Sequence, residues 1–177
     1  EQQAIQWQDL LNVFAVGNDG QFGCPGLATG FGTVLGGYQS AKNVLCVGWG
    51  DKDIKASPGS SFGPVKDGRI KPEIMATGSE VRSAGANNAY VTDWGSSLSA
   101  PAVAGGAALL IERYRQLHSG ANPPSALVKA LLMNGATDID KPGPDYRTGF
   151  GWLNLNRSLD MMKENRFFSS AIANGAT

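Results

Sequence analysis

The stretch Gly-Ser-Ser-Leu-Ser-Ala-Pro-Ala-Val-Ala-Gly occupies residues 95–105 and predicts where the longest helix of this 177-residue chain begins. Serine is favoured at a helix N-cap and proline is tolerated within the first turn, so the helix should begin close to Ser97. The residues after the proline are almost all small, and larger apolar side chains then recur at helical spacing at Ile111, Tyr114 and Leu117. We therefore predict a helix whose first half presses on a sheet and is surrounded by protein, and whose second half reaches solvent.

A helix start of this kind can also hold a catalytic nucleophile. A serine hydroxyl becomes nucleophilic when a base takes its proton and N–H donors meet the developing oxyanion, and a helix start offers free backbone N–H groups. A plain serine N-cap meets the same description. The residue types alone do not choose among the three serines, Ser96, Ser97 and Ser99.

Short apolar runs elsewhere in the chain predict strands, and apolar residues at helical spacing predict further helices. The expected strands are residues 13–16, 44–49 and 73–76, and the expected helices are residues 4–11, 126–133 and 153–163. Runs without polar alternation are typical of parallel strands that are covered on both faces. We see no repeat or linker, so the chain should be one domain or part of one.

Composition excludes several functional classes. Hydrophobic residues make up 42% of the chain and charged residues 17%, which indicates a globular protein. Fifteen basic residues balance fifteen acidic ones without runs of one sign, so neither nucleic acid nor a membrane surface is an expected partner. The two cysteines allow at most one disulfide, and the apolar neighbours of Cys46 favour a buried free thiol.

Residues 95–105 resemble the nucleophile motif of the subtilase family of serine peptidases, Gly-Thr-Ser-Met-Ala-x-Pro followed by a Val-Ala-Gly helix. In this alignment Ser97 takes the place of the nucleophile, while Ser96 and Leu98 stand where Thr and Met are usual. Further segments similar to the family follow in the correct order: Ala-Val-Gly-Asn-Asp-Gly at 15–20, Ser-Ser-Phe-Gly-Pro at 60–64, Lys-Pro-Glu-Ile-Met-Ala-Thr-Gly at 71–78 and Gly-Phe-Gly-Trp-Leu-Asn at 149–154.

The resemblance implies that residues 1–177 form the C-terminal part of one subtilisin-like α/β domain, with a doubly wound, mostly parallel sheet and helices on both faces. It implies a serine endopeptidase that hydrolyses peptide bonds through an acyl-enzyme on Ser97 in the full-length protein. Asn18 takes the place of the family residue whose side-chain amide donates to the oxyanion. One wall of the pocket for the residue before the scissile bond would come from Ala15, Val16 and Gly17.

The two other members of a Ser–His–Asp triad are not expected within this chain. The only histidine, His118, lies 21 residues after Ser97 on one predicted helix, which places it about 30 Å away. In the subtilisin order Asp and His precede Ser, so the resemblance places both before residue 1. We therefore expect the isolated chain to be inactive, and we interpret Asp93 as a loop or capping residue.

Two other interpretations remain. Residues 30–36, Gly-Phe-Gly-Thr-Val-Leu-Gly, have the outline of a dinucleotide-binding loop, but they follow no clear strand and open no convincing helix. A non-catalytic binding or scaffold module derived from the peptidase fold is the stronger alternative, because a fold does not guarantee chemistry. The presence of both Ser97 and Asn18 favours the enzyme.

The implied chemistry needs no cofactor and no metal, although a structural calcium ion near residues 30–36 would fit the family. The implied partners are a polypeptide substrate and the missing N-terminal part of the same domain. An incomplete parallel sheet leaves an open strand edge, so we also expect a tendency to self-association. An extracellular or periplasmic location follows from the resemblance alone, since the chain shows no targeting signal.

Overall fold

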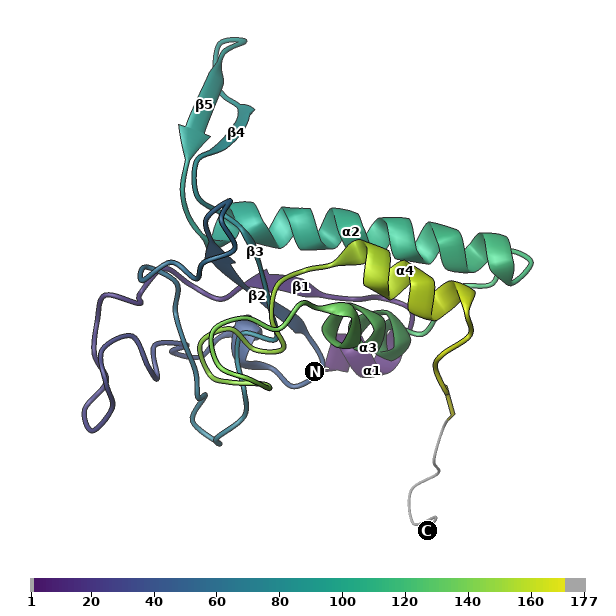
Figure 1. The fold of residues 1–177 in the computed structure, drawn as a ribbon, viewed down its shortest axis with the longest axis horizontal. Coiled ribbons are helices and arrows are strands. Elements are labelled where there is room, and N and C mark those ends of the chain that lie inside the picture. Colours follow the sequence, from purple (N-terminus) through teal and green to yellow (C-terminus); the bar gives the residue numbers. More distant parts are fainter. Residues whose placement is uncertain (1, 171–177) are drawn as a thin grey trace.

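The computed structural model describes residues 2–170 and is built around a parallel three-stranded sheet (Figure 1). The strands lie in the order β1 (Val13–Ala15), β2 (Leu45–Gly50) and β3 (Ile74–Thr77). In β2 only Trp49 is half-buried and the other residues are buried, which explains its apolar run in the sequence. All three predicted strands are confirmed to within one or two residues.

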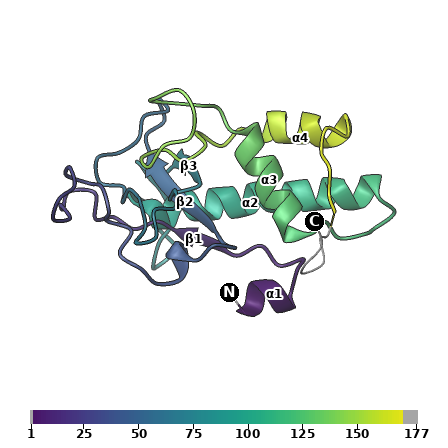
Figure 2. The same ribbon diagram turned by 90° about the horizontal axis from the view of Figure 1, so that it is seen from below.

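Helices cover one face of this sheet (Figures 1 and 2). After the short α1 (Gln2–Gln6), the long α2 (Ser96–Leu117) packs on all three strands, and α3 (Ser125–Gly135) and α4 (Leu155–Lys163) pack beside it. The main core joins side chains of these helices to β2 and β3, among them Val47, Ile74, Val103, Leu110, Leu131 and Met162. No helix within residues 2–170 is long and apolar enough to cross a membrane.

Loop residues pack on the opposite face of β2. There Cys46 contacts Val16, Val34 and Val65, and all four side chains are buried. Cys46 is a free thiol, as expected, and its burial raises its pKa above the ordinary value, so it stays protonated at neutral pH. A mixed α/β fold with a parallel sheet is therefore confirmed.

The first half of α2 is covered on one side only, although its small residues predicted a helix surrounded by protein. Its buried residues follow each other at helical spacing and face the sheet: Val103, Gly106, Ala107 and Leu110. The opposite side carries Pro101, Ala104, Gly105 and Ala108, which are exposed, and Leu109, which is 62% exposed. None of the described elements packs over this apolar side.

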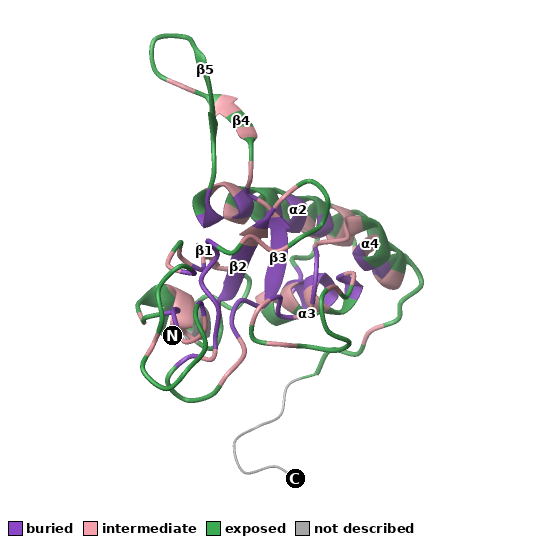
Figure 3. Ribbon diagram, turned by 60° about the vertical axis from the view of Figure 1, so that its left-hand side comes forward, coloured by how far each residue is buried: buried purple, intermediate pink, exposed green. Residues whose placement is uncertain are grey.

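A two-stranded antiparallel hairpin was not predicted. Strands β4 (Val81–Ala84) and β5 (Tyr90–Asp93) pair with each other and stand away from the body of the molecule (Figures 1 and 3). The turn contains Asn87 and Asn88, both with positive φ, a conformation that asparagine tolerates. Every residue of β5 is exposed, so the strand has no buried face and no hydrophobic alternation that would reveal it.

A buried cluster of charges connects α3 with the segment just before β3. The Oε1 atom of Glu73 lies 2.6 Å from the Lys71 ammonium and 2.7 Å from the Lys129 ammonium, and the three side chains are 7%, 1% and 18% exposed. The Cys46 N–H donates to the other carboxylate oxygen at 2.7 Å. Burial lowers the pKa of Lys71 below its ordinary value, and the Glu73 carboxylate partly offsets this effect.

Candidate active site

The N-terminus of α2 distinguishes Ser97 from its two neighbouring serines. The side chains of Ser96 and Ser99 are buried, and Ser99 Oγ donates to the Ser96 carbonyl at 3.0 Å. Ser97 is exposed, and no hydrogen bond to its hydroxyl is found within residues 2–170. Since a nucleophile must reach its substrate, the structure supports Ser97 in that role and leaves structural roles to the other two.

Gly95 allows the sharp entry into this helix. Its φ of 140° lies in a region that L-residues rarely adopt, and a Cβ atom at this position would come within 3.2 Å of Asn18 Nδ2. The Gly95 N–H donates to the Gly78 carbonyl at 2.8 Å, which attaches the helix start to the segment after β3. The glycine therefore lets the backbone of the helix start approach Asn18 closely.

Asn18 follows β1, and contacts with Ser96 orient its side chain. Asn18 Oδ1 accepts hydrogen bonds from the Ser96 N–H at 2.9 Å and from the Ser96 hydroxyl at 3.0 Å. Both partners are donors, so the carbonyl oxygen of the amide must face them, and the Nδ2 donor points elsewhere. Asn18 is exposed, which leaves this NH₂ group accessible.

The Ser96 hydroxyl is a bridge that the sequence did not reveal. It accepts from the Gly17 N–H at 3.2 Å while it donates to Asn18, and so it connects the loop after β1 with the start of α2. The only sign of this role in the sequence was that Ser96 precedes the candidate nucleophile at a position where the family carries threonine, another hydroxyl residue. The bridge spans about 79 residues of sequence, and spacing alone could not predict it.

The arrangement suits stabilisation of an oxyanion. Backbone N–H groups in the first turn of a helix have no partner within the helix, and Ser97 lies at the second position of α2. Asn18 is bonded to the preceding residue, Ser96, so the Asn18 Nδ2 group and the Ser97 N–H are candidate donors to the oxyanion of acyl transfer. The site lies at the carboxyl end of β1, where open α/β sheets commonly bind ligands.

The three residues predicted to form a pocket wall lie in the segment between β1 and Asn18. The Val16 side chain is 1% exposed and packs inward, and its N–H donates to the Val47 carbonyl at 2.9 Å. Ala15 and Gly17 are half-buried. Any contribution of this segment to a substrate pocket would therefore come from its backbone and from Ala15, and this role remains a prediction.

The residues that the sequence analysis set aside make contacts of their own. His118 follows the last residue of α2, where its Nδ1 lies 2.9 Å from the Tyr114 carbonyl and its ring stacks on Tyr114. Asp93 ends β5 and accepts from the Trp94 N–H at 2.8 Å. Residues 30–36 lie in the loop between β1 and β2 and do not open a helix. Among residues 2–170, no group of three acidic, histidine or cysteine side chains could hold a metal ion.

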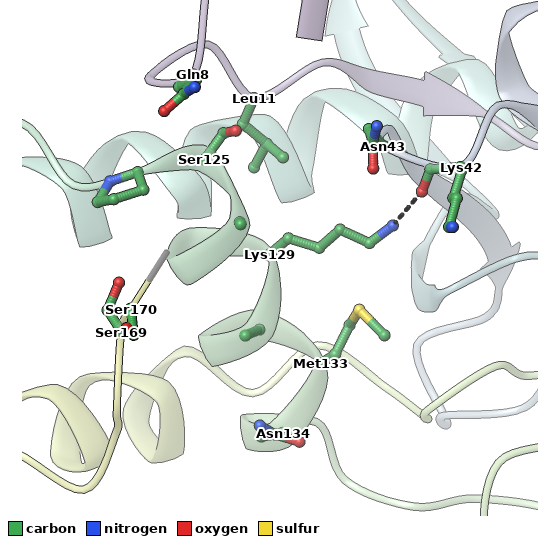
Figure 4. Close-up of a pocket in the computed structure, with 13 residues that line it drawn as sticks. Gln8, Leu11, Lys42, Asn43, Ser125, Lys129, Met133, Asn134, Ser169 and Ser170 are labelled. Atoms are coloured by element: carbon green, nitrogen blue, oxygen red, sulfur yellow. Dashed lines mark hydrogen bonds between the residues drawn. The ribbon is translucent and has the colours of Figure 1, made fainter. Parts of the chain in front are cut away.

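A separate cavity of about 860 Å³ lies beside α3 (Figure 4). Lys129 reaches toward its far wall, where its ammonium meets the carbonyls of Val44 at 2.7 Å and Lys42 at 3.2 Å as well as Glu73. These three acceptors match the three donors of an ammonium group. Lys129 is thus a structural residue, and this cavity lies near the amino end of β2, whereas Ser97 and Asn18 lie near the carboxyl ends of the strands.

Comparison with known proteins places the chain among peptidases. The model of the subtilase family matches residues 1–151. The C5a peptidase of Streptococcus pyogenes is 42% identical over 87 residues, which is 48% of this chain and 8% of that protein. The subtilisin-like protease SBT6.1 of Arabidopsis thaliana is 27% identical over 165 residues, which is 90% of this chain and 15% of that protein.

Solved structures agree with this result. The prenylagaramide maturation protease PagA superimposes with a TM-score of 0.70 at 28% identity, over 90% of this chain and 53% of that one. A lanthipeptide protease gives a TM-score of 0.70 at 26% identity, over 91% and 53%. The chain thus spans about half the length of these solved chains and a small part of the length of the curated relatives. Because the family model matches residues 1–151, more than half of the chain, the chain belongs to the subtilase family of serine proteases.

Proposed function

We propose that this chain supplies the nucleophile and one oxyanion donor of a subtilisin-type serine endopeptidase, and that the Asp and His of the triad belong to the rest of the complete domain. The observation that carries the proposal is the exposed Ser97 at a helix start that is tied to an oriented Asn18 amide. Relatives described as peptidases and proteases support a polypeptide substrate. We also propose that the complete protein hydrolyses peptides in an extracellular or periplasmic location.

In this mechanism the Ser97 Oγ attacks the carbonyl carbon of the scissile bond while the imidazole takes its proton. The carbonyl oxygen becomes an oxyanion and accepts hydrogen bonds from Asn18 Nδ2 and the Ser97 N–H. The intermediate collapses to an acyl-enzyme, and the leaving amine takes the proton from the imidazole. Water, with the imidazole again as base, then attacks the ester, releases the acid product and restores the serine.

The test is covalent labelling with a fluorophosphonate probe. In the complete protein we expect the probe to label Ser97, and we expect the Ser97→Ala variant to remain unlabelled. Residues 1–177 expressed alone should show no labelling above that variant, because His118 is at the far end of α2, about 30 Å from Ser97. Equal labelling of the complete protein and of its Ser97→Ala variant would contradict the proposal and favour the non-catalytic module.

The Ser96 bridge gives a second prediction for the complete protein. Ser96→Ala removes the hydroxyl that joins Gly17 to Asn18 but keeps the Ser96 N–H bond to Asn18, so we expect kcat to fall by about 2- to 12-fold, the equivalent of one net hydrogen bond. Ser96→Thr retains the hydroxyl and should restore kcat. Ser40→Ala is the matched control, since the Ser40 hydroxyl bonds only within its own turn. If kcat of the Ser96→Thr variant were no higher than kcat of the Ser96→Ala variant, the positioning role of the Ser96 hydroxyl would be contradicted.

A further inference from the structure

The β4–β5 hairpin presents unpaired strand edges next to the candidate nucleophile. Within residues 2–170 no other strand pairs with either β4 or β5 (Figure 3). Tyr90 is 70% exposed, Val91 is 47% exposed and Trp94, just after β5, is 56% exposed. An edge that carries both free backbone groups and exposed apolar side chains is suited to binding another extended chain.

The register shows which backbone groups face outward. The Gly85 N–H donates to the Ala89 carbonyl at 2.8 Å, and hydrogen-bonded pairs alternate with non-bonded ones along an antiparallel ladder. Ser83 opposite Val91 is therefore the next bonded pair, and Ala84 opposite Tyr90 is a non-bonded pair. It follows that Tyr90 and Thr92 direct their N–H and C=O groups away from β4, and that Ala84 does the same on the other edge.

The β5 edge is the one continuous with the candidate active site. Strand β5 leads through Trp94 and Gly95 into α2, and the Gly95 N–H bond to the Gly78 carbonyl secures the base of the hairpin at the helix start. Thr92 precedes Ser97 by five residues, so their backbones lie at most about 17 Å apart. About five residues of an extended polypeptide could span this distance.

We infer that the outer edge of β5 docks an extended segment of the polypeptide substrate, which adds to the hairpin as a third strand while its scissile bond lies at Ser97. The inference rests on the proposed function and names a binding surface within it. Tyr90 and Thr92 would exchange backbone hydrogen bonds with the substrate whatever its sequence. The exposed side chains of Tyr90 and Val91 point to opposite faces of the strand, so each would contact substrate side chains on its own face.

Hydrogen exchange tests the contact without requiring catalysis. In the complete Ser97→Ala protein, a 16-residue peptide that spans a cleavage site should slow exchange of the Tyr90 and Thr92 amides and leave the Ala84 amide unchanged. Unchanged exchange at saturating peptide would overturn the inference. So would slow exchange at Tyr90 and Thr92 before peptide is added, because another part of the protein or a second copy would then already cover the edge.

A pair of proline variants tests its effect on turnover. Proline is tolerated on a strand edge where its missing N–H faces outward, so Thr92→Pro removes a docking donor and Ala84→Pro is the matched control on the other edge. Thr92→Pro should lower kcat/KM for the 16-residue peptide by about 2- to 12-fold and leave turnover of a four-residue substrate unchanged. Ala84→Pro should change neither.

Labelling of Ser97 by the small fluorophosphonate separates the two proposals. An unchanged labelling rate in Thr92→Pro shows that the site around Ser97 is intact. Absent labelling in the unmodified protein would contradict the proposed function, and the hydrogen-exchange experiment alone would then test docking. Equal effects of Thr92→Pro and Ala84→Pro on the long peptide would overturn the docking edge.

Discussion

Replacement of Asn18 with alanine is expected to lower kcat of the complete protein by about 10²–10³-fold while KM changes little, a range taken from the loss of such a donor in a subtilisin. The Nδ2 group would bind the oxyanion, whose charge develops only after attack. Its loss therefore raises the energy of the transition state more than that of the bound substrate. Steady-state kinetics on a peptide substrate would measure this effect.

The Asn18→Asp variant tests the NH₂ donor of Asn18 separately from the contacts that Oδ1 makes with Ser96. Asn18→Asp keeps an oxygen that can accept from the Ser96 N–H and hydroxyl, as Oδ1 does at 2.9 and 3.0 Å, but it replaces the NH₂ donor with a second acceptor. We expect it to lose at least as much kcat as the alanine variant. An aspartate variant with near-normal kcat would show that Asn18 only supports the loop, and would remove it from the oxyanion site.

Replacement of Glu73 with glutamine is expected to lower the free energy of unfolding of this domain by about 3–5 kcal/mol. The carboxylate lies between the ammonium groups of Lys71, which is buried, and Lys129, which is half-buried, and a neutral amide would leave both charges without a counter-ion. Hydrogen exchange of the β2 amides in the complete protein would report the change, because these core amides exchange only when the sheet opens.

The matched control is Glu164→Gln. Glu164 also forms an ion pair, with Arg166 at 2.6 Å, but both side chains are more than half exposed. Water screens such a pair, so the expected change in unfolding free energy is within about 0.5 kcal/mol. If Glu73→Gln lowered the free energy of unfolding no more than Glu164→Gln does, the cluster of Glu73, Lys71 and Lys129 would not be a source of stability.

The sequence determined the elements that have a buried face. Strands β1, β2 and β3 and helices α2, α3 and α4 lie close to their predicted bounds, because burial imposes an apolar pattern on the residues that experience it. The β4–β5 hairpin was not predicted, because β5 has no buried side and therefore no apolar pattern. The N-terminal helix was predicted too long: residues 4–11 have helical spacing, but α1 ends at Gln6.

The sequence by itself also determined the family, through motifs in the correct order, and indicated Ser97 and Asn18 as the residues to examine. Only the tertiary structure showed a difference among the three serines, since Ser96 and Ser99 are buried and Ser97 is exposed. Only the tertiary structure showed that Ser96 orients Asn18 and that Glu73 serves two lysines. The physical reason is that the Ser96 hydrogen bonds and the Glu73–Lys129 ion pair join residues 56 to 79 positions apart, and such contacts leave no periodic trace in the chain, whereas burial does.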